Sequence, residues 1–250
     1  PNSASWRWYS DPENETPTSP LAASNTAPIG VANDATLALR VAVRETEGVP
    51  GDNARFTLQY SEDPTFTTFA TVRATSTCME NALWCYTDGG GVDNATITTA
   101  LLPESDACVG GVGGGCGTHN ESPGDRDGFT HAADATTEYS FTITQQGARV
   151  NAVYYFRLFD ERSGFPVPVA AGESPPSLVT EGSALTFSVT GLPAGTSTAG
   201  VVTTATSTAS SINFGSLEAN VEEIAGHRIA VDTNATEGYQ VLSFARSALT

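Results

Sequence analysis

The sequence predicts an all-β chain with two immunoglobulin-like β-sandwich domains in tandem, preceded by an extended N-terminal arm. Apolar and polar residues alternate in many short segments, which is the pattern of antiparallel strands with one buried face. No segment carries a sustained apolar stripe of helical period, and the nearest candidate, residues 217–225, lacks one. Only 16% of the residues are charged, and the polarity comes mostly from hydroxyl and small side chains, as is typical of extracellular all-β proteins.

Residues 1–30 are expected to form a short strand followed by an extended arm. The strand is Ser5–Tyr9, in which aromatic side chains alternate with polar ones. Closely spaced prolines then forbid a helix, namely Pro12, Pro17, Pro20 and Pro28.

Residues 31–180 are expected to form the first sandwich. Its clearest strand is Thr36–Arg44, with leucine and valine on one face and small or charged residues on the other. We expect the polar faces, and the acidic side chains in general, to be exposed to solvent. The same alternation predicts strands at Arg55–Tyr60, Phe69–Arg73, Glu138–Thr144 and Ala152–Phe159.

A long insert, Thr75–Asp134, interrupts this domain and contains all 4 cysteines of the chain: Cys78, Cys85, Cys108 and Cys116. Insertions of this length are functional or are surface elaborations. The spacing does not fit the paired C-x₂₋₄-C ligands of zinc sites. Two disulfides in an oxidising compartment are therefore predicted. We favour Cys78–Cys85 and Cys108–Cys116, because these pairings close the shortest loops.

Residues 181–250 are expected to form a smaller sandwich, after a boundary in the proline-rich run Pro166–Ser177. This part is either a minimal sandwich or an incomplete one. An incomplete sandwich leaves a strand edge that another chain can fill. Its expected strands are Leu185–Val189, Val201–Val202, Ile212–Phe214, Ile224–Val231 and Tyr239–Phe244.

Charge and hydropathy exclude several classes of partner. The formal net charge is −17 and the sequence pI is about 4.3, so nucleic acid, which requires clustered cations, is not an expected partner. No apolar run is long enough to span a bilayer. All 11 basic residues are arginine. A lysine-dependent isopeptide link between subunits is therefore excluded, and any polymer must be held together non-covalently or by disulfides.

No catalytic residues and no cofactor are predicted, and we do not expect an enzyme. The 3 histidines, His119, His131 and His227, lie outside the H-E-x-x-H and G-x-S-x-G patterns. The segment Gly195–Ala199 resembles the second pattern but lacks its final glycine. The glycine run Gly110–Gly115 has neither the spacing nor the lysine of a phosphate-binding loop. A catalytic triad or a catalytic pair of carboxylates, made of residues distant in sequence, stays an open alternative.

Two acidic, glycine-rich loops are candidate calcium sites. Carboxylates next to flexible glycines suit this cation, although neither loop has EF-hand spacing. Turn formation alone also explains Asp-Gly pairs. The candidate ligands are Asp88, Asp93, Asp125 and Asp127.

Four N-glycosylation sequons occur, with acceptors Asn14, Asn94, Asn120 and Asn234. The third is weakened by the proline that follows it. O-linked sugar on Thr203–Ser211 is an alternative.

The order of these motifs resembles secreted β-rich surface modules of candidate-phylum (Patescibacteria-like) bacteria. The similarity lies in Ser5–Tyr9, Leu37–Arg44, Phe56–Tyr60 and the Tyr-Tyr-Phe-Arg-Leu run at 154–158, which is similar to the family's "TYYFRL". Residues 211–217 and 231–239 are similar to the "INFG…TNAT.GY" β module found beside them. The resemblance departs at residues 9–12. It implies an extracellular or cell-surface structural protein and carries no active site.

We therefore expect an extracellular structural subunit that polymerises with itself into a filament or surface lattice. In this hypothesis the arm completes a sheet edge of a neighbouring copy, with Trp6, Trp8 and Tyr9 as its anchors. The arm can instead pair within its own domain, as the first strand of an ordinary sandwich.

The alternative function is an adhesin or carbohydrate-binding module of a cell-surface protein. Trp84, Tyr86 and the cysteine-bearing insert would form its recognition surface, with surface glycans as partners. Aromatic side chains suit stacking on sugars, although a tryptophan beside a disulfide also fits ordinary packing.

Overall fold

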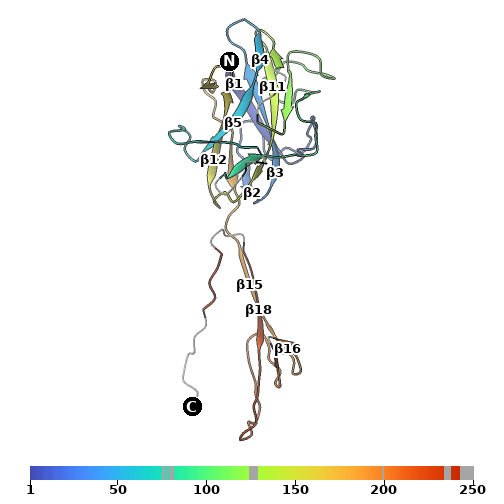
Figure 1. Cartoon of the computed structure of the whole chain (residues 1–250), viewed down its shortest axis with the longest axis vertical. Helices are drawn as coiled ribbons and strands as arrows, with labels where there is room; N and C mark the ends of the chain where they lie inside the picture. Colours follow the sequence, from blue (N-terminus) through green and yellow to red (C-terminus); the bar gives the residue numbers. More distant parts are fainter. Residues whose placement is uncertain are drawn as a thin grey trace. The chain divides into compact units, whose positions relative to one another are not determined.

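The computed structural model describes residues 1–74, 76, 78, 82–123, 129–198, 200–233 and 238–242. Within these residues the chain forms 18 β-strands and no α-helix, and therefore no helix that could cross a membrane (Figure 1). The prediction of an all-β chain is confirmed. Contacts divide the chain into two compact units, Pro1–Gly182 and Ser183–Thr250. The run Pro166–Ser177 therefore lies inside the first unit, because its residues pair with the strands of that unit.

The first sheet of the first unit has the strand order β1-β3-β11-β9-β8, and β7 also pairs with β11. β3 pairs antiparallel with β1 on one side and with β11 on the other, whereas β9 runs parallel to β11. The insert supplies three of these strands. The bounds are β1 Asn2–Tyr9, β3 Thr36–Arg44, β7 Trp84–Tyr86, β8 Ala95–Thr96, β9 Cys116–Asn120 and β11 Thr136–Gln145.

The second sheet has the order β2-β14-β12-β5-β6, with β13 also paired to β12. A separate ribbon joins β4 to β10. The bounds are β2 Ile29–Val31, β4 Gly51–Ala54, β5 Phe56–Ser61, β6 Ala70–Thr71, β10 Phe129–His131, β12 Val153–Asp160, β13 Phe165–Pro166 and β14 Ser177–Thr180.

The apolar faces of the two sheets meet in one sandwich-like core. Phe156 of β12 lies at its centre, with ring centroids 5.1 Å from Trp8 and 5.2 Å from Trp84. Such edge-to-face contacts add to the stabilisation from burial alone. Trp6 and Trp8 are each 1% exposed, so β1 is part of this core.

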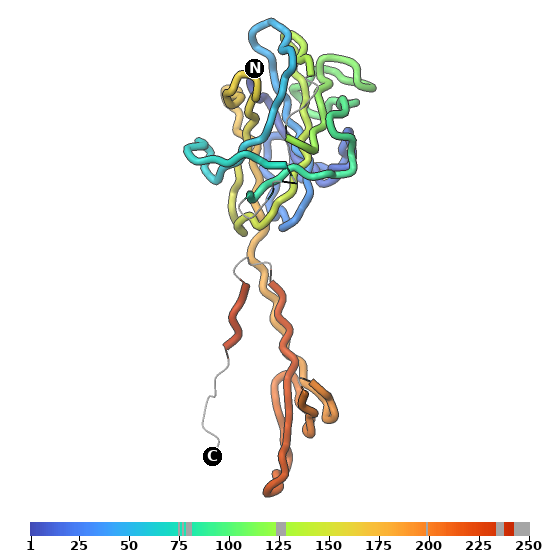
Figure 2. Tube along the Cα trace, viewed as in Figure 1, coloured from blue at the N-terminus to red at the C-terminus, as the bar shows by residue number. Residues whose placement is uncertain are grey.

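The outer face of the first sheet is buried as well. Arg40, Glu138 and Thr142 have no exposed surface, and Ile97 and Leu102 of the insert are buried with them. Figure 2 shows the insert as the green part of the trace, along one side of the unit. The expectation of a solvated polar face is wrong here, because the insert covers it.

The second unit contains two short ribbons. β15 (Leu185–Gly191) pairs antiparallel with β18 (His227–Thr233), and β16 (Ser197–Thr198) pairs with β17 (Val201–Val202). The expected strand at 212–214 is reduced to a single bridge between Ser207 and Ile212. A strand was expected at Tyr239–Phe244. Residues 239–242 are not in a strand, and residues 243 and 244 lie outside the described part of the chain.

Candidate assembly surface

The expected donor arm is a strand of its own domain. β1 pairs with β3 from Asn2 opposite Arg44 to Tyr9 opposite Ala38, with one shift of register between Ser3 and Ser5. The indole N–H of Trp8 donates to the carbonyl of Ser177 at 2.9 Å. Donation of this segment to a neighbour would strip the core of two tryptophans. In the structure the arm therefore pairs within its own domain. Trp6, Trp8 and Tyr9 are core residues and do not anchor in a neighbouring copy.

The outer edge of β1 is covered by the same chain. The backbone N–H groups of Leu21 and Asn25 donate to the carbonyls of Trp8 and Trp6, each at 2.9 Å. Near the other end of the strand, Ala170 N–H donates to the carbonyl of Ser3 at 2.8 Å. This covering protects an edge that would otherwise be a template for further pairing.

The aromatic residues of the expected glycan surface lie in the core. Trp84 and Tyr86 have no exposed surface, and the Tyr86 hydroxyl accepts a hydrogen bond from Leu58 N–H at 2.9 Å. Burial raises the pKa of this hydroxyl. Neither ring can stack on a sugar, so these two residues are not a recognition surface.

A buried ion pair holds the insert against the first sheet. Arg40 Nη1 lies 2.9 Å from Glu138 Oε2 and 3.3 Å from the Thr99 carbonyl. The other carboxylate oxygen of Glu138 accepts the backbone N–H of Leu101 at 2.6 Å, and also that of Leu102. Burial lowers the pKa of Arg40, against the opposing effect of Glu138. Sequence reasoning missed this pair, because alternation alone does not show which polar side chains become covered.

The cysteines form the two short-loop pairs that we favoured. Cα atoms are 6.0 Å apart in Cys78–Cys85 and 5.3 Å apart in Cys108–Cys116, and no cysteine is free. Both separations fit disulfide geometry. The zinc alternative is therefore wrong for these thiols.

The candidate calcium ligands that the structure describes are hydrogen-bonded within loops. Asp88 Oδ1 accepts Gly90 N–H at 2.8 Å, while the Asp93 carboxylate accepts Glu121 N–H at 2.7 Å and the Ser122 hydroxyl at 2.6 Å. Across the described ranges, no group of three or more His, Cys, Asp and Glu residues could hold a metal. Asp125 and Asp127 lie outside the described residues.

The sequons differ in accessibility. Asn14 is exposed and Asn94 is partly buried. Asn120 is 3% exposed, and its side-chain amide donates to the Ser140 carbonyl at 3.1 Å. A buried, occupied amide cannot carry sugar in the folded domain, so Asn120 is removed from the candidate acceptors. Asn234 lies outside the described residues.

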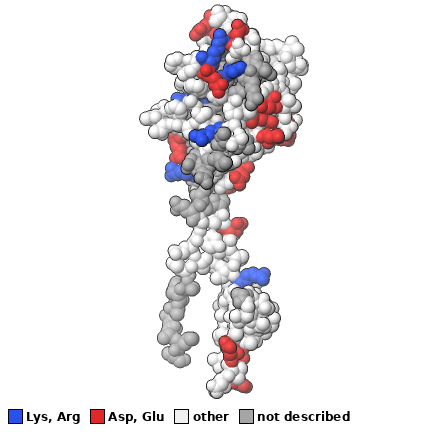
Figure 3. Space-filling view, viewed as in Figure 1, with Lys and Arg blue, Asp and Glu red and all other residues white. Residues whose placement is uncertain are grey.

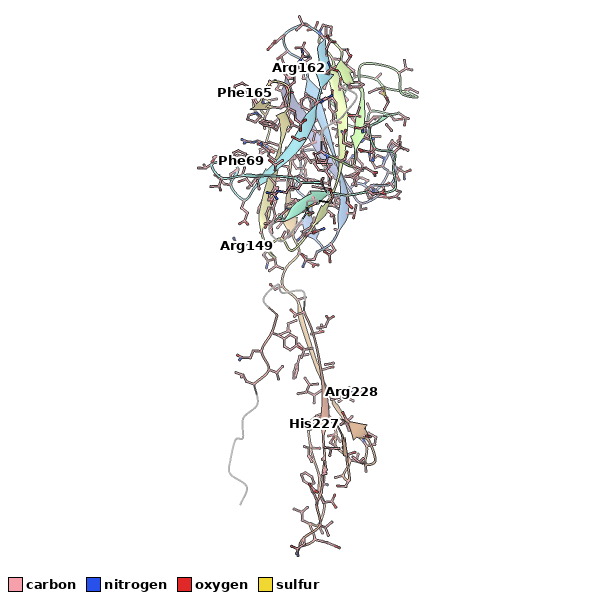
Figure 4. The ribbon with its side chains drawn as sticks, in the orientation of Figure 1. Phe69, Arg149, Arg162, Phe165, His227 and Arg228 are labelled. Carbon is pink, nitrogen blue, oxygen red and sulfur yellow. A yellow bond between two sulfur atoms is a disulfide. The ribbon has the colours of Figure 1, made fainter. Side chains whose placement is uncertain are left out.

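The histidines make separate structural contacts. His119 is fully buried, with Nε2 3.4 Å from Glu121 Oε1. His131 lies 3.0 Å from the Tyr139 hydroxyl, and burial lowers its pKa. His227 Nε2 is 2.7 Å from the Thr208 carbonyl, and it is labelled with Arg228 at the beginning of β18 in Figure 4.

The β15–β18 ribbon has one apolar and one polar face. The register places Phe187 opposite Val231 and Val189 opposite Ile229, so these side chains share a face. Thr186, Ser188 and Thr190 lie on the other face, opposite Asp232, Ala230 and Arg228.

Three of the five apolar side chains on this face of the ribbon are exposed, and Val189 and Val231 are partly buried. Leu185 is 62% exposed, Phe187 56% and Ile229 50%. Elsewhere in this unit the same is true of Ile212, Phe214, Leu217, Val221, Tyr239, Val241 and Leu242. Figure 3 shows few charged atoms on the visible side of this unit. Exposed apolar residues are therefore concentrated in the described part of this unit.

Neither outer edge of the ribbon pairs with a third strand in the part of the chain that the structure describes. β15 has no charged residue, no proline and no register shift, which are the usual protections of an edge. The edges of the first unit are different. In its two larger sheets β1 is covered, β6 and β8 have two residues each, and β2 has three.

Comparison of the chain with family models, with curated proteins and with solved structures finds no match in any of the three.

Proposed function

We propose that this protein is an extracellular structural subunit that assembles with copies of itself into a filament or surface lattice. In this proposal the second unit is part of an immunoglobulin-like sandwich that another copy completes. The observation that carries it is the uncovered apolar face of the β15–β18 ribbon, with Phe187 56% and Ile229 50% exposed.

The energetics of the ribbon favour a partner. A two-stranded ribbon in water is marginal at best, and a third strand or a packed face is needed for independent stability. Burying an apolar side chain such as Phe or Ile stabilises by roughly 1.5–3 kcal/mol. A second copy that adds a strand to the ribbon, or that packs on this face, supplies the stabilisation that the described part of the unit lacks.

The first unit supports the location and the structural role. Two disulfides close loops in it, which fits an oxidising compartment. Its core is complete, so it can fold before assembly and serve as the rigid body of the subunit. A head-to-tail contact between different surfaces of two copies then propagates instead of closing.

The test is direct imaging of the purified full chain by negative-stain electron microscopy, together with light scattering over a wide range of concentration. Ordered polymers whose mass rises with concentration are expected. Monomers at every concentration would contradict the proposal.

A pair of variants locates the contact. Phe187→Asp places a charge on the ribbon and is expected to prevent polymer formation. Phe165→Asp is the matched control, because Phe165 is 71% exposed on the first unit, where Figure 4 labels it. The control is expected to polymerise normally, and equal behaviour of the two variants would place the contact elsewhere.

A further inference from the structure

We infer that the contact between copies is a strand addition in which residues 239–242 of one copy pair with the outer edge of β15 in the next. This inference rests on the proposed function and names its donor and its acceptor. It follows from two features of the second unit: an unprotected edge and an unpaired segment of matching chemistry.

The acceptor is β15 rather than β18. β15 reads Leu-Thr-Phe-Ser-Val-Thr-Gly and is uncharged throughout. β18 carries Arg228 and Asp232 on its polar face and begins at His227, whose ring bonds the Thr208 carbonyl at 2.7 Å. An uncharged, regular edge is the better template for a new strand.

The donor is the segment from Tyr239 to Leu242. Within the described part of the chain, its four residues belong to no strand and have no backbone hydrogen bond. The segment is uncharged and strand-forming in composition. Tyr239 is 56% exposed and Val241 46%, and their spacing of two places both side chains on one face of a strand.

The faces match when the two are joined. With Tyr239 and Val241 on the side of Phe187 and Val189, the donor extends the apolar face of the ribbon. Gln240 then lies on the polar side, beside the row of Thr186, Ser188 and Thr190, and Leu242 at the end of the segment shares that side. The added strand gives β15 partners on both sides and widens the apolar face of the ribbon by two large side chains.

The occupant is a second copy because the chain does not make this pairing at home. The shortest return from β18 would bring the segment back along the outer edge of β18 as a hairpin. The structure has no such pairing among the described residues. A segment that has no partner strand among the described residues suits addition to the ribbon of a neighbour, as in donor-strand exchange.

The experiment is disulfide trapping between two single-cysteine variants of the full chain, mixed under mild oxidation. Every native cysteine is already in a disulfide, so any new cross-link forms between the introduced thiols. Gln240→Cys is mixed in turn with Thr186→Cys, Ser188→Cys and Thr190→Cys, because directly opposed strand residues lie within disulfide reach. We expect a covalent dimer with at least one of the three, and its loss on reduction.

Ala230→Cys is the matched control. It lies on the same polar face but on β18, one strand further from the donor, so about 10 Å separates it from Gln240. No dimer is expected with it. Val241→Pro, which cannot extend a strand ladder, is expected to abolish polymers, whereas Val241→Thr keeps a strand-forming residue and is expected to retain them.

The outcomes separate the two claims. Polymers in the microscope without any of the three cross-links overturn this inference and leave the proposed function standing. Absence of both polymers and cross-links overturns both. The double variant Gln240→Cys/Ser188→Cys tests pairing within one copy. A cross-link inside its monomers, without dimers in the mixture of single variants, would show intramolecular pairing and overturn the exchange between copies.

Discussion

Arg40 and Glu138 form an ion pair that solvent does not reach, with Nη1 2.9 Å from Oε2 and both side chains fully buried. The pair joins two neighbouring strands of the first sheet and also binds the backbone of the insert. It therefore links the sandwich to the cysteine-bearing segment that covers it.

Arg40→Met is expected to destabilise the first unit by about 3–5 kcal/mol, because Glu138 would stay buried without its counter-charge. Urea unfolding followed by tryptophan fluorescence measures the change. The double variant Arg40→Met/Glu138→Gln is expected to be more stable than the single variant, since the carboxamide carries no charge. Arg149→Ala is the control: Arg149 and Glu62 also lie 2.9 Å apart, but both are exposed, and a change within about 1 kcal/mol is expected.

Trp8→Ala is expected to cost about 3–5 kcal/mol of the free energy of unfolding, because the indole packs on Phe156 inside the core. Arg7→Ala, on the opposite face of the same strand, is expected to change stability much less. Deletion of residues 1–9 is expected to abolish cooperative unfolding of the first unit. A folded, stable truncated chain would show that β1 is dispensable and reopen its role as a donated arm.

Removal of the Cys108–Cys116 bridge in the double variant Cys108→Ala/Cys116→Ala is expected to destabilise the first unit by about 2–3 kcal/mol. The sequence separation is 8 residues, and closing such a loop removes entropy from the unfolded chain. Thermal unfolding without reductant measures the loss. An unchanged melting temperature would mean that the unfolded chain is not restrained by this bridge.

Glu45 is expected to make stability depend on acid pH. Burial alone would raise its pKa, but backbone N–H groups of Glu47, Asp134 and Gly48 donate to its carboxylate and lower the pKa to about 2. The folded pKa lies below the ordinary value of 4.5, so this stabilisation is present above pH 4.5 and is lost as the pH falls toward 2.

The Glu45→Gln variant tests this dependence by urea unfolding at a series of pH values. Its free energy of unfolding is expected to approach that of the parent chain as the pH falls through this window. Glu47→Gln is the control, because the Glu47 side chain is exposed and only its backbone takes part. A constant difference between Glu45→Gln and the parent would contradict the assignment.

The sequence predicts those strands whose apolar side chains alternate on a buried face. β3, β5, β11 and β12 lie within one or two residues of the expected bounds. β9 was missed because Cys-Gly-Thr-His-Asn has no such alternation. Its place depends on Gly117, where a Cβ atom would lie 2.0 Å from the Glu138 carbonyl oxygen. That close approach of two backbones is invisible to a pattern of side-chain polarity.

The candidate assembly surface was predicted only in part. Alternation at residues 185–189 and 224–231 predicts the two strands of the ribbon. The expected donor, Ser5–Tyr9, lies in the core of its own domain instead, because Trp6 and Trp8 have the same alternating pattern whether they anchor in a neighbour or at home. Only the three-dimensional packing distinguishes the two.

The loop that covers the β1 edge has a consequence for the architecture of any polymer. With the β1 edge covered, each subunit of the polymer that we infer gives one strand and receives one, and such chains are expected to lengthen without branching. A subunit that cannot donate its strand can still accept one, and it then ends the fibre. Addition of the Val241→Pro variant to the parent protein is therefore expected to shorten the fibres in proportion to the fraction added.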